Sequence, residues 1–195
     1  MHALGAGPHP DVCERLVAAY SEPHRHYHTV AHINACLGEL DRTGELATSR
    51  AEVEAALWFH DAVYSTRASD NEERSARWAA QFLAAAGLPD EVGERVRQHI
   101  MATRHDARPI AGDSALVVDI DLSILGQDAG TYASFEQNVR SEYGWVPRAL
   151  FRRRRREILQ SFLDREFIYA MPDFRDRYEA PARVNLRKAI EALGK

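Results

Sequence analysis

The chain has 195 residues, of which 45% are hydrophobic and 28% are charged, an ordinary balance for a globular protein with one well-buried core. Its formal net charge of −4 argues against a general nucleic-acid binder. No segment approaches the ~18 consecutive apolar residues of a membrane span, which excludes a membrane protein of that kind.

In chain order, most segments have the apolar spacing of α-helices. Residues 1–9 are expected to be a loose tail. The N-terminus also lacks both the long apolar run and the basic start of a signal peptide. A cytoplasmic location is therefore expected. Helical spacing follows over residues 11–20, 31–40, 53–58, 69–87 and 89–103. The fourth of these segments has a capping signature and is expected to end at Gly87, and the fifth has Pro89 in its first turn.

The stretch 114–126 is ambiguous, because "ALVVDI" could be a buried strand. Since nothing else in the sequence looks like a strand that could pair with it, we expect a buried helix. Helical patterns then cover residues 129–144, 148–169 and 175–193. The sequence thus predicts an all-α fold, a compact multi-helix bundle, with a single domain over residues 10–195.

Four of the nine histidines fall within "HRHYHTVAH", residues 24–32. His28 and His32 are four residues apart, so they share one face if the segment is helical. Imidazole is a common ligand of transition metals, and this density favours a metal site over scattered surface histidines.

Two further segments place acids beside or inside apolar runs. His60 and Asp61 end an apolar helix that includes Trp58 and Phe59, and such polar groups at the edge of a core need partners. Asp119 and Asp121 interrupt "VVDIDLSILG". Being two apart on a helix, they point in different directions, so at most one can face a given site.

One site would explain all three segments. Because the two cysteines form neither a disulfide framework nor a CxxC pair, we expect a metal to use only His and carboxylate ligands. Two nitrogens and two carboxylates suit a divalent transition metal, Mn, Co, Ni, Zn or Fe, with open positions for water and substrate. That arrangement is typical of a catalytic site.

The chain resembles the HD superfamily of metal-dependent phosphohydrolases, and more closely a small bacterial group of predicted HD phosphohydrolases. The matching stretches run from Tyr20 to Leu186 and are "YSEPHRHYHTVAHI", "FHDAVY", "DNEERSA", "DIDLSILG" and "ARVNL". The resemblance implies an HD-type helical domain whose metal ligands are His32, His60, Asp61 and Asp121, the last chosen over Asp119. By similarity to cyclic-nucleotide phosphodiesterases, His28 is implied as the general acid, although Thr29 replaces their Asn.

The implied function is hydrolysis of a small phosphorylated substrate, such as a nucleotide or a phosphorylated metabolite, by a metal-activated water. Glu72 or Glu73 could orient that water or bind a second metal, or could simply belong to the first turn of a helix. Arg25 is expected to contact phosphate or to form a salt bridge. Substrate contacts are also expected from His24, which could replace His28 as the acid, from His105, and from Arg154.

Several alternatives remain open at this stage. If His99 and His105 both reach the site, a dinuclear-iron HD oxygenase becomes the alternative. A non-catalytic nucleotide-binding HD module is another. Within the run Arg152–Arg156, residues 154 and 155 fall on the apolar stripe of their helix, so at least one arginine should face inward, in a buried salt bridge or toward phosphate. The aromatic stripe from Tyr132 to Tyr143 fits either a core or a homodimer interface.

Overall fold

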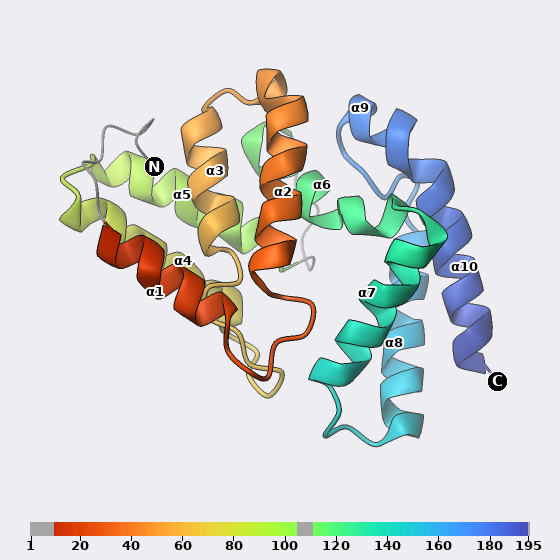
Figure 1. Cartoon of the computed structure of the whole chain (residues 1–195). Coiled ribbons are helices and arrows are strands. Elements are labelled where there is room, and N and C mark those ends of the chain that lie inside the picture. The colour runs from red at the N-terminus through yellow and green to blue at the C-terminus, as the bar shows by residue number, and fades with distance from the viewer. Residues whose placement is uncertain (1–9, 105–110, 195) are drawn as a thin grey trace. The chain divides into compact units, whose positions relative to one another are not determined.

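The computed structural model describes residues 10–104 and 111–194 of the chain. Every regular element in these ranges is helical, so the predicted all-α class is confirmed and "ALVVDI" is part of a helix. The chain divides into two compact units between Asp121 and Leu122 (Figure 1). The single domain expected over residues 10–195 stays a prediction. Within the described ranges, no helix combines the length and the apolar character that crossing a bilayer requires.

Unit 1 is built around one apolar helix, α3. It comprises α1 (Pro10–Tyr20), α2 (Val30–Thr43), the short 3₁₀ helix η2 (Gly44–Leu46), α3 (Arg50–Phe59), α4 (Asn71–Ala85), α5 (Asp90–Ala102) and α6 (Asp113–Asp121). Helix α3 packs against α2, α4, α5 and α6. Its residues Val53, Ala56, Leu57 and Phe59 are fully buried, which explains why its apolar run carries no clean amphipathic pattern.

Glycine and side-chain bonds set the ends of α4. As predicted, the helix ends next to Gly87, whose φ of 78° lies in the left-handed region that favours glycine. At the other end, Asp70 occupies the N-cap position, but its side chain forms no capping hydrogen bond. Asn71 instead exchanges two hydrogen bonds with the backbone of Ser65, and Ser75 accepts from the Val63 amide. These bonds hold the loop that follows His60 and Asp61.

Unit 2 is centred on its last helix. It comprises η3 (Leu122–Gly126), α7 (Ala129–Glu142), α8 (Arg148–Leu163), α9 (Pro172–Phe174), the π-helical turn η4 (Arg175–Glu179) and α10 (Ala180–Gly194). Helix α10 packs against α8, η3 and η4. Gly126 allows η3 to approach η4, because a Cβ atom there would lie 2.6 Å from the Cβ of Tyr178. Tyr132, Phe135 and Val139 are buried, so most of the aromatic stripe belongs to the core.

The predicted helix over residues 148–169 is too long. Helix α8 ends at Leu163, because later backbone amides find side-chain partners outside a helix. The amides of Ile168 and Tyr169 both donate to the Glu179 carboxylate. Tyr169 is itself fully buried and donates its hydroxyl to the Leu122 carbonyl. These tertiary contacts outweigh the local preference for continuing the helix.

The last predicted helix, 175–193, begins earlier and is irregular. Helical structure starts at Pro172, passes through the π-helical turn η4 and continues as α10 to Gly194. Pro181 lies just after this turn. Because proline has no amide hydrogen and its ring crowds the preceding turn, an α-helical bond from residue 181 is lost. The π-helical turn η4 lies directly before this break in the bonding pattern.

Candidate metal centre

The candidate centre lies in unit 1, where three helices bring their ends together. His32 lies in the first turn of α2, His60 is the C-cap residue of α3, and Asp121 is the last residue of α6. Asp61 follows His60 directly. The four side chains predicted as metal ligands therefore lie together, although they are up to 89 positions apart in the sequence, from His32 to Asp121.

The donor atoms are spaced as the ligands of one ion would be. The Nε2 atom of His60 lies 3.2 Å from His32 Nε2, 3.0 Å from an Asp61 oxygen and 3.6 Å from an Asp121 oxygen. His32 Nε2 lies 3.2 Å from the same Asp121 oxygen. Ligands about 2.1 Å from a tetrahedral or octahedral ion are about 3.0–3.4 Å apart. Three of the four observed separations fall within that range, and the fourth, 3.6 Å between His60 and Asp121, is slightly longer.

The tautomer of His60 creates a demand for positive charge. Its Nδ1 atom lies 2.8 Å from the Leu57 carbonyl, which can only accept, so Nδ1 carries a hydrogen. In the neutral imidazole, Nε2 then directs a lone pair at two carboxylates and a second imidazole. Such an arrangement is repulsive unless a cation, either a proton or a metal ion, occupies the space between the donors.

The pKa values of His60 and Asp61 reflect the same need for a positive charge between the donors. Burial lowers the pKa of His60, but the carboxylates of Asp61 and Asp121 outweigh burial and raise it well above its usual value. Burial raises the pKa of Asp61, yet His60 and then His28 hold it well below its usual range. In the absence of a metal, a proton on His60 therefore supplies the positive charge.

The centre is open on its carboxylate side. The imidazoles of His32 and His60 are only 3% and 1% exposed, whereas the carboxylates of Asp61 and Asp121 are 14% and 16% exposed. His28, at 21%, lies on this side with its Nε2 atom 3.9 Å from an Asp61 oxygen. The carboxylate oxygens can therefore be reached from solvent, whereas the two imidazoles cannot.

Asp119 and Asp121 have different environments, as their spacing predicted. Asp121 directs an oxygen at both imidazoles, whereas Asp119 is completely buried in unit 1. The geometry therefore favours Asp121 as the fourth donor.

Arg25 has a structural role, the salt-bridge alternative of the two that the sequence left open. Its side chain is fully buried and donates to the carbonyls of His28, Asp61 and Ala62, as well as to the carboxylate of Glu22. These bonds tie the segment of His28 to the loop of Asp61. The guanidinium is therefore committed to backbone carbonyls and not directed at a substrate phosphate.

Cys36 is a donor that the sequence analysis missed. Its buried sulfur lies 3.7 Å from His32 Nε2, one helical turn along α2. Donor atoms within 4.8 Å of one another form two groups that share His32, one with His60 and Asp61 and the other with Cys36 and Asp121. The expectation that a metal would use only His and carboxylate ligands stays a prediction, but Cys36 is a further donor within reach of His32 and Asp121. The four-residue spacing of His32 and Cys36 was the signal that could have found this donor.

The other residues that the sequence analysis proposed for the site, His28, His24, Glu72 and Glu73, have different surroundings. His28 is not on α2, which begins at Val30, yet its ring centroid is 6.0 Å from that of His32 and 4.2 Å from that of Tyr64. His24 is exposed and lies 3.1 Å from the Tyr64 carbonyl through Nε2. Glu72 and Glu73 occupy the first turn of α4, and Glu73 pairs with Arg77.

His99 belongs to another buried cluster. Its Nδ1 atom lies 2.8 Å from the Ser114 hydroxyl, and its Nε2 atom is buried without a hydrogen-bond partner. Burial lowers the pKa of His99, outweighing the opposite effects of Asp113 and Glu52. His105, the other histidine proposed from this region, lies outside the described residues.

In unit 2, Arg155 rather than Arg154 is the inward-facing arginine. Arg155 is 12% exposed and pairs with Glu136, which confirms that one arginine of the run faces inward. Arg154, proposed as a substrate contact, is 65% exposed and pairs with Glu157. The prediction that Arg154 lies on the buried stripe is wrong, because, of these two residues, only Arg155 is directed toward α7.

Comparisons of the chain with protein-family models, with curated proteins and with solved structures found no match.

Proposed function

We propose that unit 1 is a metal-dependent hydrolase of small phosphate esters, such as a nucleotide or a phosphorylated metabolite. The observation that carries this proposal is the position of His60 Nε2, which lies 3.0–3.6 Å from donor atoms of His32, Asp61 and Asp121. The sequence resemblance to HD phosphohydrolases supports the reaction type.

The donor set fits a divalent transition ion, Mn, Co, Ni, Zn or Fe, through two imidazole nitrogens and two carboxylates. The two carboxylates would balance the charge of the ion. When bound, such an ion supplies Lewis acidity, which lowers the pKa of a coordinated water and neutralises phosphate charge. His60 Nε2 lies within 3.6 Å of a donor atom of each of the other three residues, which favours a single ion over a pair.

Residues of the chain would orient the metal ligands and supply a proton to the leaving group. The bond from His60 Nδ1 to Leu57 fixes the ring so that Nε2 faces the centre. Arg25 holds Asp61 in place through the loop carbonyls. His28, whose Nε2 atom lies 3.9 Å from an Asp61 oxygen, is suited to donate a proton to the leaving oxygen of the ester.

The decisive experiment measures metal content and phosphate release on the same untagged samples. The full chain, Asp61→Asn and His28→Gln would be loaded in turn with each of the five metals and assayed against nucleotides and small phosphate esters. Asp41→Asn is the matched control, since Asp41 lies on α2 like His32 but is 74% exposed and pairs with Arg50.

The wild type and the control are expected to bind about one ion per chain and release phosphate. Asp61→Asn should lose both, whereas His28→Gln should keep the metal and lose turnover. Failure to bind any of the metals would refute the proposal. Two irons per chain without phosphate release would support the dinuclear-iron oxygenase instead, and bound nucleotide without turnover would support a binding module.

A further inference from the structure

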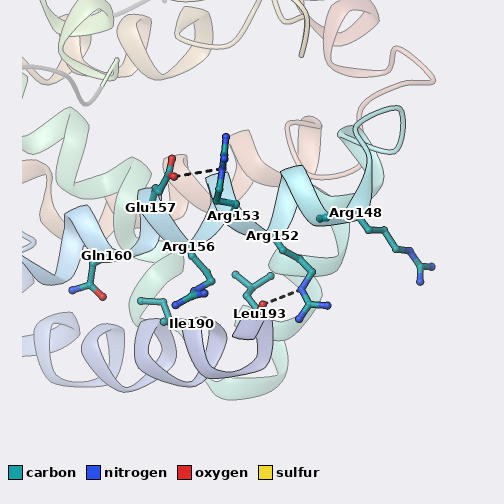
Figure 2. A pocket seen from close by; sticks show the side chains of 9 residues that line it. Arg148, Arg152, Arg153, Arg156, Glu157, Gln160, Ile190 and Leu193 are labelled. Carbon is teal, nitrogen blue, oxygen red and sulfur yellow. Dashed lines mark hydrogen bonds and ion pairs between the residues drawn. The ribbon is translucent and has the colours of Figure 1, made fainter. Parts of the chain in front are cut away.

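A second candidate site lies in unit 2, in a groove between α8 and α10. The groove has a volume of about 670 Å³, within the range of pockets that hold small molecules. Figure 2 shows the side chains that line it, most of them from α8, with α10 forming the opposite wall. The lining includes four arginines and a single carboxylate, that of Glu157.

The arginines are arranged as a stripe. Arg148, Arg152 and Arg156 follow one another at four-residue intervals, and Gln160 continues the same face of α8. Four residues correspond to a rise of about 6 Å along a helix, so the guanidinium groups form a ladder rather than a cluster. In Figure 2, Arg152, Arg156 and Gln160 extend toward α10.

Most of this positive charge is not neutralised within the protein. Arg153 and Arg154 both pair with Glu157. Arg152 donates to the Leu193 carbonyl near the end of α10, which is not a full charge. Within the residues that the structure describes, neither Arg148 nor Arg156 forms an ion pair. The two unpaired arginines both line the groove.

This arrangement is unfavourable for α8 without a bound anion. Like charges four residues apart on a helix destabilise it. The amino end of a helix favours acidic residues, yet the first turn of α8 has none and begins with Arg148. An anion held by the stripe would offset both effects, because it adds negative charge near the helix start and between the guanidinium groups.

The apolar wall indicates what else the ligand carries. Ala149 on α8 and Ile190 and Leu193 on α10 line the same groove, and Figure 2 shows Ile190 beside Arg156. A simple inorganic anion would leave this surface unused. Guanidinium groups match phosphate oxygens in a bidentate manner, and the ladder can contact neighbouring phosphates of one chain.

We infer that the groove between α8 and α10 binds a small organic anion with at least two linked phosphates and an apolar ring, the chemistry of a nucleoside di- or triphosphate. The phosphates lie along Arg148, Arg152 and Arg156, and the ring rests against Ile190 and Leu193. This site shares no residue with the centre in unit 1, so it does not depend on the proposed hydrolase.

The test is calorimetric titration of the full chain with ADP and ATP in EDTA, which removes any contribution from a metal in unit 1. Arg148→Gln and Arg156→Gln remove unpaired guanidinium groups, and each is expected to weaken binding about tenfold. Arg154→Gln is the matched control, because it removes the same charge from α8 at a position that does not line the groove. Asp61→Asn should bind as the wild type does.

Folding provides an independent readout. Arg156→Gln should leave the unfolding midpoint of the ligand-free protein unchanged or raised, since it relieves repulsion along α8. The inference is overturned if millimolar ADP and ATP do not bind, or if Arg154→Gln weakens binding as much as Arg156→Gln. It is also overturned if Asp61→Asn abolishes binding, which would assign the nucleotide to unit 1, or if the groove binds inorganic phosphate as tightly as ADP.

Discussion

Replacing Arg25 with methionine is expected to destabilise unit 1 by about 3–5 kcal/mol. The methionine keeps most of the apolar length of the side chain, and so its packing beside Tyr20 and Tyr64, whose rings lie 5.1 and 5.3 Å from the guanidinium. It removes every hydrogen bond that the guanidinium donates. The expected loss in the free energy of unfolding therefore comes from the missing hydrogen bonds and not from a cavity.

The magnitude follows from the partners that are left behind. Three backbone carbonyls, of His28, Asp61 and Ala62, lose their donor. Each buried or half-buried acceptor without a partner costs roughly 1–3 kcal/mol, and water can recover part of that cost at the more accessible ones. Arg25→Lys should lose about 2 kcal/mol, because one ammonium cannot reach all three carbonyls in the geometry of a planar guanidinium.

Urea unfolding followed by circular dichroism, with EDTA present, measures this loss without any contribution from bound metal. Arg77→Met is the matched control, because Arg77 is 63% exposed and only pairs with Glu73 on the same helix. Its effect should stay below about 0.5 kcal/mol. A loss for Arg25→Met no larger than that of the control would refute the positioning role of Arg25.

Three further predictions concern buried polar groups. Burial lowers the pKa of His99 in the folded protein below its unfolded value of ~6.5. The unfolded state therefore takes up a proton first as the pH falls below ~6.5, and the free energy of unfolding decreases. His99→Met should therefore flatten the unfolding free energy between about pH 7 and pH 5, and equal slopes would contradict this account. Glu136→Gln leaves the buried guanidinium of Arg155 without its carboxylate and should cost about 3 kcal/mol in urea unfolding; a loss under about 1 kcal/mol would show that the pair is effectively solvated. In a thiol-reagent assay, exposed Cys13 should react at once and Cys36 only on unfolding, since burial and then Asp121 and Asp61 raise the pKa of Cys36; two fast thiols would be inconsistent with this.

The sequence predicted that the four donor side chains lie together through residues that violate the local pattern. His60 and Asp61 end the most buried helix of unit 1, and Asp121 ends a helix that is almost entirely apolar. A polar group in such a position needs a partner that its own helix cannot supply. That requirement indicates a shared site without any knowledge of the tertiary fold, and the four donors do lie together.

The sequence predicted less where partners come from distant backbone. Nothing near Arg25 shows that its guanidinium binds carbonyls 36 and 37 positions away, so a phosphate contact appeared as reasonable as a salt bridge. Similarly, the end of α8 depends on amides that bond to Glu179, 11 positions after Ile168. Local periodicity contains no information about such bonds, which form only once the chain has folded.

The arginine run of α8 shows within one helix both what helical spacing predicts and what depends on partners from other helices. Helical spacing placed residues 154 and 155 on the same stripe, but only Arg155 has a carboxylate from another helix, that of Glu136. Arg153, Arg154 and Arg155 have carboxylate partners, so among the described arginines of α8 the charge without a carboxylate lies on Arg148, Arg152 and Arg156, which all line the groove. Surface arginines alone would not be informative. Unpaired arginines concentrated in a groove beside an apolar wall are informative, because the helix is destabilised by its own charge until an anion binds.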